Sequence, residues 1–302
     1  MAVSGHRRLP ENRSRTGRRQ GPASTANIGE IGIRCATRYL RAPGPFAGLA
    51  VTDTRVLWWP SWLPDSKGAG VTVGLIEGDY SPDVPDLRDA QITVERFGTR
   101  EPGGPLLCEH GSFSAALLVG QGTDHLRGVV PSARLLIACT ASASGDAHPN
   151  AVSDAVEWLA PRVALIVIPL GRNDEHPRLA ATVRNAAVAG CVLIAAAGNR
   201  ADRSVLFPAR ADACLAISAC TAMGSTAPHY PTSPDVDLIV RGDHVTAPVA
   251  AGSVRCRSGT SIACVLAGGL IAAKISNSLP DKMIPSQSSL APPHPAGWIR
   301  AR

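Results

Sequence analysis

A serine at the start of an apolar helix has the surroundings of a reactive residue in this sequence. Residues 257–274 read RSGTSIACVLAGGLIAAK, with small residues ahead of an apolar run that contains no proline. This pattern predicts a tight turn and then a buried helix that begins near Ser261. The first turn of a helix has unpaired N–H groups and a positive dipole end, which would stabilise negative charge beside a serine oxygen. Ser261 is therefore a candidate nucleophile, with an ordinary helix N-cap as the alternative.

Two carboxylates follow the first short run of β-branched residues. Residues 71–76, VTVGLI, lie between two glycines and predict a buried strand. Glu77 and Asp79 come at its carboxyl end, where open α/β sheets hold their sites. Three further aspartates follow, Asp83, Asp86 and Asp89. A Ca²⁺ loop or a solvated turn is therefore an open alternative for this segment.

A histidine and an asparagine come at similar places further along the chain. Residues 106–120, LLCEHGSFSAALLVG, indicate a loop that enters an apolar helix with His110 at its mouth. Residues 192–197 predict another strand, which Gly198 and Asn199 close. His110 and Asn199 are therefore expected, like Glu77 and Ser261, at the end of a strand or the start of a helix.

Strands and helices alternate between these residues. We expect strands at 71–76, 133–139, 163–168, 192–197, 214–219 and 236–240, and helices at 151–159, 178–189 and from Ser261 onward. Such alternation with short connections predicts the α/β class, as a doubly wound, mainly parallel sheet with helices on both faces. Because parallel strands share one carboxyl rim, Glu77, His110, Gly171, Asn199 and Ser261 are expected to converge there.

Composition divides the 302 residues into three parts. Residues 1–49 are rich in Arg, Gly, Pro and Ser, supply much of the net charge of +6, and predict a disordered basic arm. Residues 50–275 form the predicted domain, and residues 276–302 a flexible Pro/Ser-rich tail. Three tryptophans lead into the domain, Trp58, Trp59 and Trp62. Since the arginine run at residues 7–19 has no interleaved aromatic residues, we expect no nucleic-acid partner.

Cysteine usage and hydropathy indicate a compartment. The eight cysteines include no Cys-x-x-Cys pair and mostly lie in apolar runs, which predicts buried free thiols and no metal site. No apolar export region follows Arg7 and Arg8, and no run reaches the roughly 18 apolar residues of a membrane span. We therefore expect a cytoplasmic protein with no membrane partner. The sequence leaves the oligomeric state open.

Four motifs follow one another in the order acid, histidine, asparagine and serine. They are IEGD (76–79) followed by VPDL (84–87), HGSFSAA (110–116), AAGN (196–199) and GTSIA (259–263), with GVVPSARL (128–135) and FPA (207–209) between them. Over about residues 63–275 the sequence resembles the subtilisin-like serine peptidases, the subtilases, whose catalytic residues follow in this order.

The resemblance implies acyl transfer by a catalytic triad. Ser261 would attack a peptide carbonyl, His110 would take its proton and return it to the leaving amine, and Glu77 would fix the imidazole tautomer. Asn199 and the Ser261 N–H would bind the oxyanion. The resemblance implies a peptide or protein substrate and no metal or organic cofactor.

Two departures separate the sequence from the family pattern. Counted back from residues 85–87, Glu77 takes the place of the family's Asp, and Asp79 takes that of a glycine. In the segment that lines the substrate, the family's Ser-Leu-Gly is Pro-Leu-Gly, so one backbone N–H is absent. Leu170 and Gly171 are the substrate-binding residues that the resemblance implies.

Two functions of different classes follow from these observations. The first is an intracellular serine endopeptidase, dedicated to one peptide such as a leader or precursor made in the same cell. The alternative is a catalytically weak or inactive homologue that serves as a peptide-binding module. A small-molecule binder would need a glycine-rich phosphate loop after the first strand, and residues 77–80, EGDY, are not one.

Overall fold

The computed structural model describes residues 67–98, 105–122, 127–140, 147–201, 204–221, 228–232, 235–250 and 253–278. The predicted basic arm, the three tryptophans that lead into the domain and the residues after 278 lie outside these ranges.

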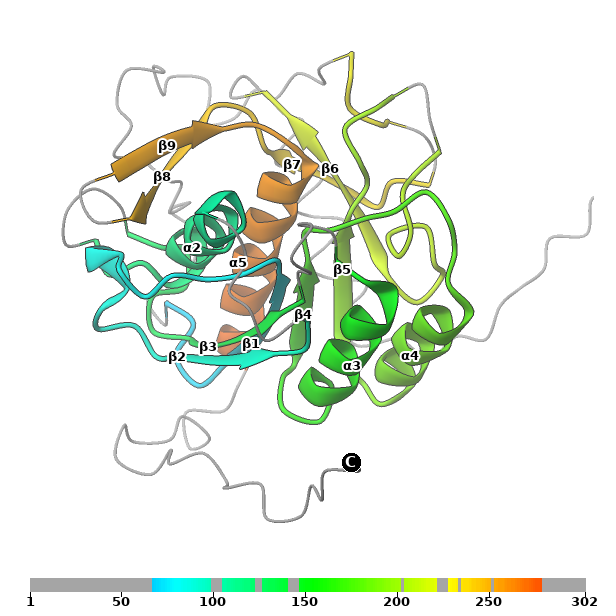
Figure 1. The fold of residues 1–302 in the computed structure, drawn as a ribbon, viewed down its shortest axis with the longest axis horizontal. Coiled ribbons are helices and arrows are strands. Elements are labelled where there is room, and N and C mark those ends of the chain that lie inside the picture. Colours follow the sequence, from blue (N-terminus) through cyan, green and yellow to red (C-terminus); the bar gives the residue numbers. More distant parts are fainter. Residues whose placement is uncertain are drawn as a thin grey trace, which may run out of the picture.

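A parallel sheet forms the middle layer of the described structure (Figure 1). Its seven strands are β1 Thr72–Glu77, β2 Ile92–Arg96, β3 Arg134–Cys139, β4 Leu165–Ile168, β5 Val192–Ala196, β6 Leu215–Cys220 and β7 Leu238–Arg241. They lie in the order β2-β3-β1-β4-β5-β6-β7, and every neighbouring pair is parallel. The central strands are buried on both faces, which explains why they are continuous apolar runs.

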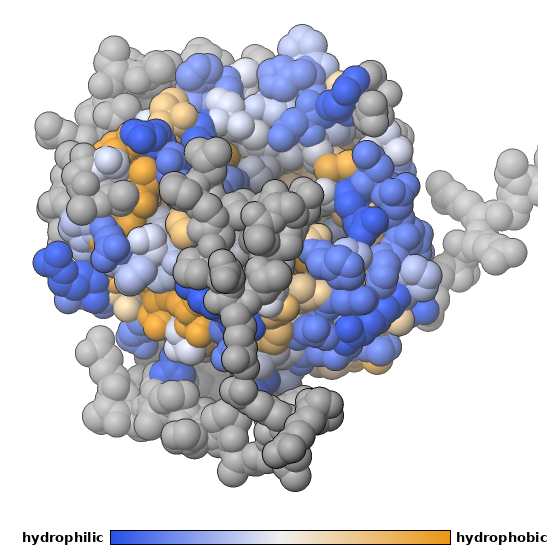
Figure 2. Space-filling view, viewed as in Figure 1, coloured by the Kyte–Doolittle hydropathy of each residue, from blue (hydrophilic) through white to orange (hydrophobic). Residues whose placement is uncertain are grey.

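Helices cover both faces of the sheet. α2 Pro105–Val119 and α5 Thr260–Ser278 pack into one apolar core, and α3 Pro149–Leu159 and α4 Pro177–Val188 pack into a second core across the sheet. The outward surface over α3 and α4 is mostly hydrophilic (Figure 2). This arrangement confirms the predicted α/β class and its doubly wound parallel sheet.

Two glycines let the central helix α5 pack closely, one against β4 of the sheet and the other against the segment between α2 and β3. A Cβ added to Gly268 would lie 2.5 Å from Val167 Cγ2, and one added to Gly269 would lie 2.7 Å from Val129 Cβ. Among the described residues, the stretch 260–277 alone is long and apolar enough to cross a membrane, but 72% of it is buried inside the fold. It is the core helix of the domain, and its close packing fixes the position of Ser261 in its first turn.

Several elements were not expected from the sequence. They are the edge strand β2, the short 3₁₀ helix η1 Pro85–Leu87, and an antiparallel hairpin of β8 Val245–Ala250 and β9 Ser253–Arg257 that packs on α2. β2 and β9 are half exposed, so neither has the apolar run that marks the central strands.

Two boundaries also differ from the expectation. α2 begins at Pro105, so His110 lies in its second turn and not at its mouth. α5 continues to Ser278, and the Ser276 hydroxyl donates to the Ala69 carbonyl at 2.7 Å, so the ordered domain extends past the expected boundary at residue 275.

Candidate active site

Glu77 is the last residue of β1, and its side chain is almost wholly buried, with 1% of the residue exposed. β1 lies between β3 and β4, where the chain order of the sheet reverses direction. The crevice at such a reversal is where open parallel sheets bind their ligands. Thr140, just after β3, fixes the backbone here by donating its N–H to the Glu77 carbonyl at 2.8 Å.

The Glu77 carboxylate is fully engaged by hydrogen-bond donors. Its Oε1 and Oε2 lie 3.0 Å and 2.9 Å from His110 Nδ1. The Ser114 hydroxyl donates to Oε1 at 2.6 Å, and the Gly78 N–H approaches Oε2 at 3.3 Å. A buried carboxylate with this many donors is held in one position.

His110 joins this carboxylate to Ser261. Its Nε2 lies 3.3 Å from Ser261 Oγ, on the side of the ring opposite Glu77. Because Glu77 accepts at Nδ1, the neutral ring carries its proton there, and the Nε2 lone pair is available to the serine hydroxyl. The charge of Glu77 raises the pKa of His110 above its ordinary value, while burial and the nearby Arg257 act in the opposite direction.

A glycine lets α2 bring His110 this close to the end of β1. A Cβ added to Gly111 would lie 1.8 Å from the Asp79 carbonyl oxygen, nearer than any side-chain atom can be. Glycine next to the histidine is therefore a requirement of this close approach between a helix and a loop.

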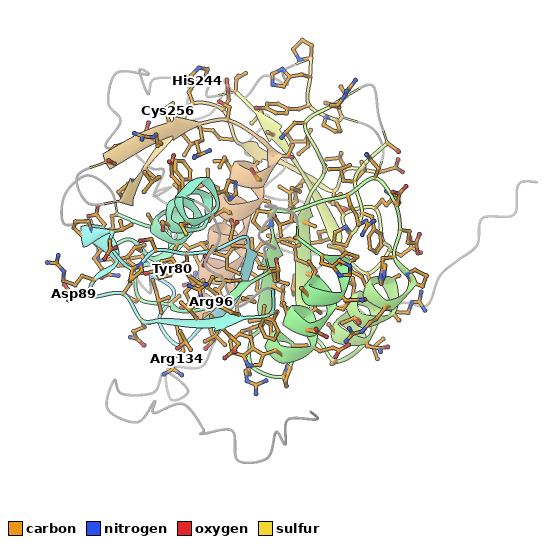
Figure 3. All side chains as sticks on the ribbon, viewed as in Figure 1. Tyr80, Asp89, Arg96, Arg134, His244 and Cys256 are labelled. Atoms are coloured by element: carbon orange, nitrogen blue, oxygen red, sulfur yellow. The ribbon has the colours of Figure 1, made fainter. Side chains whose placement is uncertain are left out.

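Asp79 is directed away from His110 despite its proximity in sequence. It is 2% exposed, forms an ion pair with Arg96 of β2, and accepts the Tyr80 N–H at 2.7 Å. Figure 3 labels Tyr80 and Arg96 at the β2 side of the molecule. The alternative of a solvated turn is therefore wrong for Asp79, because its carboxylate is buried and the charge of Arg96 offsets the cost of burying it. Within the described ranges, no group of three or more His, Cys, Asp or Glu residues could hold a metal ion.

Asn199 follows β5 and lies against the first turn of α5. Its Oδ1 accepts from the Thr260 N–H at 2.8 Å and from the Thr260 hydroxyl at 3.1 Å. With the oxygen occupied, the amide NH₂ is the group left to meet a ligand. A Cβ added to Gly259 would lie 3.5 Å from both Asn199 Nδ2 and Ser261 Oγ, so the amide and the serine hydroxyl border one space.

A pocket of about 280 Å³ adjoins Asn199. Gly171, Arg172, Arg200 and Leu206 are among the residues that line it. Of the two substrate residues implied by the resemblance, Gly171 opens on this pocket, whereas Leu170 packs partly buried against the core under α3 and α4.

The sequence reasoning did not single out Ser114, Arg172, Arg200 or Arg257. Ser114 had a detectable signal, because it is four residues after His110 in a helix and so shares its face. Arg172 and Arg200 had one as well, because they directly follow Gly171 and Asn199 in the loops after β4 and β5. Arg257 had none, since it comes from a hairpin that only the fold brings to the site.

The arrangement as a whole is suited to nucleophilic acyl transfer. A hydroxyl, an imidazole and a buried carboxylate form one hydrogen-bonded series, and an amide donor adjoins the hydroxyl. Such a group deprotonates a serine, and the amide stabilises the oxyanion that results from attack on a carbonyl.

Comparison with known proteins agrees with this chemistry. The model of the subtilase family matches residues 68–291. The chain is 23% identical to the "Intracellular serine protease" of Paenibacillus polymyxa over 224 residues, which cover 70% of this chain and 69% of that protein. It is also 23% identical to the "Major intracellular serine protease" of Bacillus subtilis (strain 168) over 226 residues, 70% of each chain. Among solved structures, it is similar to the prenylagaramide maturation protease PagA, with a TM-score of 0.62 and 21% identity over 69% of this chain and 76% of that one.

Proposed function

The chain belongs to the subtilase family of serine-type endopeptidases, and we propose that Ser261, His110 and Glu77 are its catalytic triad, with Asn199 in the oxyanion hole. One observation carries this assignment. A hydrogen-bonded series runs from the buried Glu77 through His110 to Ser261, with distances of 2.9 Å and 3.3 Å.

The reaction proceeds by two acyl transfers. Ser261 Oγ bonds to the peptide carbonyl carbon as His110 Nε2 takes the hydroxyl proton, and the resulting oxyanion receives hydrogen bonds from the Asn199 amide and the Ser261 N–H. Collapse of this intermediate breaks the C–N bond, and His110 returns the proton to the leaving amine. Water then attacks the acyl-enzyme with His110 as the base, and the second intermediate collapses to release the carboxylic acid and the free Ser261 hydroxyl.

Glu77 serves in place of the family's aspartate. Both carboxylate oxygens lie within hydrogen-bond distance of His110 Nδ1, so the longer side chain still reaches the ring. Its charge stabilises the imidazolium that forms when His110 accepts the serine proton, which accords with the raised pKa of His110.

The substrate that we infer is a peptide or precursor made in the same cell, and the location is cytoplasmic. Two sequence relatives are named intracellular serine proteases, which supports the location. The PagA structure is titled as a maturation protease, which supports action on a precursor. Gly171 forms part of the surface that receives this peptide.

A fluorophosphonate probe tests the triad without knowledge of the substrate. We expect the full-length protein to be labelled at Ser261, and Ser261→Ala and His110→Ala to lose the label. Ser258→Ala is the matched control, because that hydroxyl accepts from the His244 N–H at 2.9 Å and lies outside the triad. If the probe does not label a folded wild-type protein, the triad assignment is wrong and the peptide-binding alternative replaces it.

A further inference from the structure

The pocket beside Asn199 lies on the acyl side of the nucleophile. This placement rests on the proposed function. The leaving amine must approach His110, which protonates it, so the other half of the peptide extends toward Asn199. The side chain just before the scissile bond is attached one atom from the attacked carbonyl, and the pocket that adjoins Asn199 is within its reach.

The charges that line this pocket all have one sign. Arg172 and Arg200 are two of its nine lining residues, and none of the nine carries a carboxylate. The arginines on the His110 side differ, because Arg255 and Arg257 both pair with Glu109, at 3.2 Å and 2.6 Å. The pocket wall therefore includes positive residues and no negative one, whereas on the other side each arginine has a carboxylate partner.

Of the two arginines, Arg172 is the more firmly held and the less exposed to water. Its backbone is fixed by two hydrogen bonds with Phe207, N–H to carbonyl in each direction, at 2.8 Å. Its side chain is half buried, and its Nε is a buried donor with no hydrogen-bond partner among the described residues. Because Arg172 lines the pocket, its positive charge would attract the carboxylate of a ligand. Arg200 is exposed, so water screens its charge more.

Leu206 limits the depth of the pocket and adds an apolar surface. A Cβ on Gly171 or Gly198 would lie 2.8 Å or 2.9 Å from Leu206, so this side chain already fills the space beside both glycines. A volume of about 280 Å³ with a mostly apolar lining and two arginines among its lining residues is suited to a short aliphatic stem that ends in a carboxylate.

We propose that this pocket selects an acidic residue, glutamate or aspartate, immediately before the scissile bond. Arg172 is the main specificity-determining residue and Arg200 adds to it. Glutamate and glutamine have the same shape, so the ratio between them measures the contribution of charge alone.

Short chromogenic peptides that differ only in this residue test the proposal on the full-length protein. We expect kcat/KM for glutamate to exceed that for glutamine on the order of 10-fold, the size of one charge-assisted contact. Arg172→Gln should remove most of this ratio, and Arg200→Gln less of it. Arg184→Gln, an exposed arginine on α4, is the matched control and should leave the ratio unchanged. A ratio at or below one in the wild type, or a ratio that Arg172→Gln does not alter, overturns the proposal.

A binding measurement separates this proposal from the catalytic one. In the Ser261→Ala protein, peptides that end in glutamate or glutamine report the pocket without turnover. We expect the glutamate peptide to bind more tightly, and this difference to disappear in the double variant Ser261→Ala, Arg172→Gln. That result supports the acidic preference even if the wild type takes no fluorophosphonate label. Equal binding of the two peptides overturns it even if the label shows an active serine.

Discussion

The two sides of Ser261 are built differently. The histidine side consists of Glu77, His110 and Ser114. Glu77 and Ser114 are buried and hydrogen-bonded to one another, and Glu77 also bonds to His110. On the asparagine side, Asn199, Arg172 and Arg200 border an open pocket, and Asn199 and Arg200 are exposed. In the proposed mechanism, the buried polar contacts hold the triad in position, whereas the open pocket leaves contacts for the substrate to complete. The proposed chemistry therefore lies on one side of Ser261 and the proposed selectivity on the other.

The largest expected effect lies on the histidine side, at Glu77. Glu77→Gln should lower kcat by up to ~10⁴-fold, the loss known for the amide substitution in a trypsin-type triad, because an amide favours the wrong imidazole tautomer. Glu77→Asp should cost at most ~10²-fold, since the charge remains and only its reach changes. Single-turnover kinetics on one peptide measures both.

Asp79→Asn is the matched control for Glu77. It should lower the melting temperature, because Arg96 loses its buried partner, and leave kcat nearly unchanged. If Asp79→Asn abolishes turnover while Glu77→Gln does not, the acid of the triad has been misassigned.

The next effect tests the asparagine side. Asn199→Ala should lower kcat by ~10²–10³-fold with KM little changed, a magnitude carried over from the corresponding asparagine of a subtilisin. In the proposed mechanism the amide acts on the oxyanion, which exists only after attack, so the loss should appear in kcat. Asn185→Ala, on the exposed face of α4, is the control. A loss confined to KM would make Asn199 a substrate-binding residue only.

A smaller effect is expected from the hydroxyl behind the triad. Ser114→Ala removes the 2.6 Å hydrogen bond to Glu77 and should lower kcat by about 10-fold, the equivalent of one hydrogen bond to a charged group. Ser112→Ala is matched in type, helix and burial, but its hydroxyl donates to the Ser81 carbonyl at 3.2 Å. Equal losses of activity in the two variants would indicate a general packing defect and not positioning of Glu77.

The smallest effect is a shift in pH dependence. Arg257 lowers the pKa of His110, so Arg257→Gln should raise it. Activity requires neutral His110 as the base, and the acidic limb of kcat/KM should therefore move to higher pH. Glu77→Gln should move the same limb to lower pH, because it removes the charge that raises this pKa. Shifts of the same sign in both variants would contradict the electrostatic account of His110.

Most of the sheet could be predicted from the sequence because its central strands are buried on both faces. Strands were expected at residues 71–76 and 192–197. β1 begins and ends one residue later than the first, and β5 ends one residue earlier than the second. The edge strand β2 and the β8–β9 hairpin could not be predicted in this way. They are short and half exposed, and their stability comes from pairing and packing with residues distant in sequence.

The residue types of the site and their order are readable from the sequence: a serine before an apolar helix, a histidine beside a glycine, and an asparagine after a strand. The environments of Glu77 and Asp79 are not, because they depend on the folded arrangement of the chain. These carboxylates are two residues apart, and both are buried. Glu77 meets His110 from α2, and Asp79 meets Arg96 from β2. A buried charge needs a partner, and for each carboxylate that partner comes from an element elsewhere in the chain, which the fold alone brings into contact.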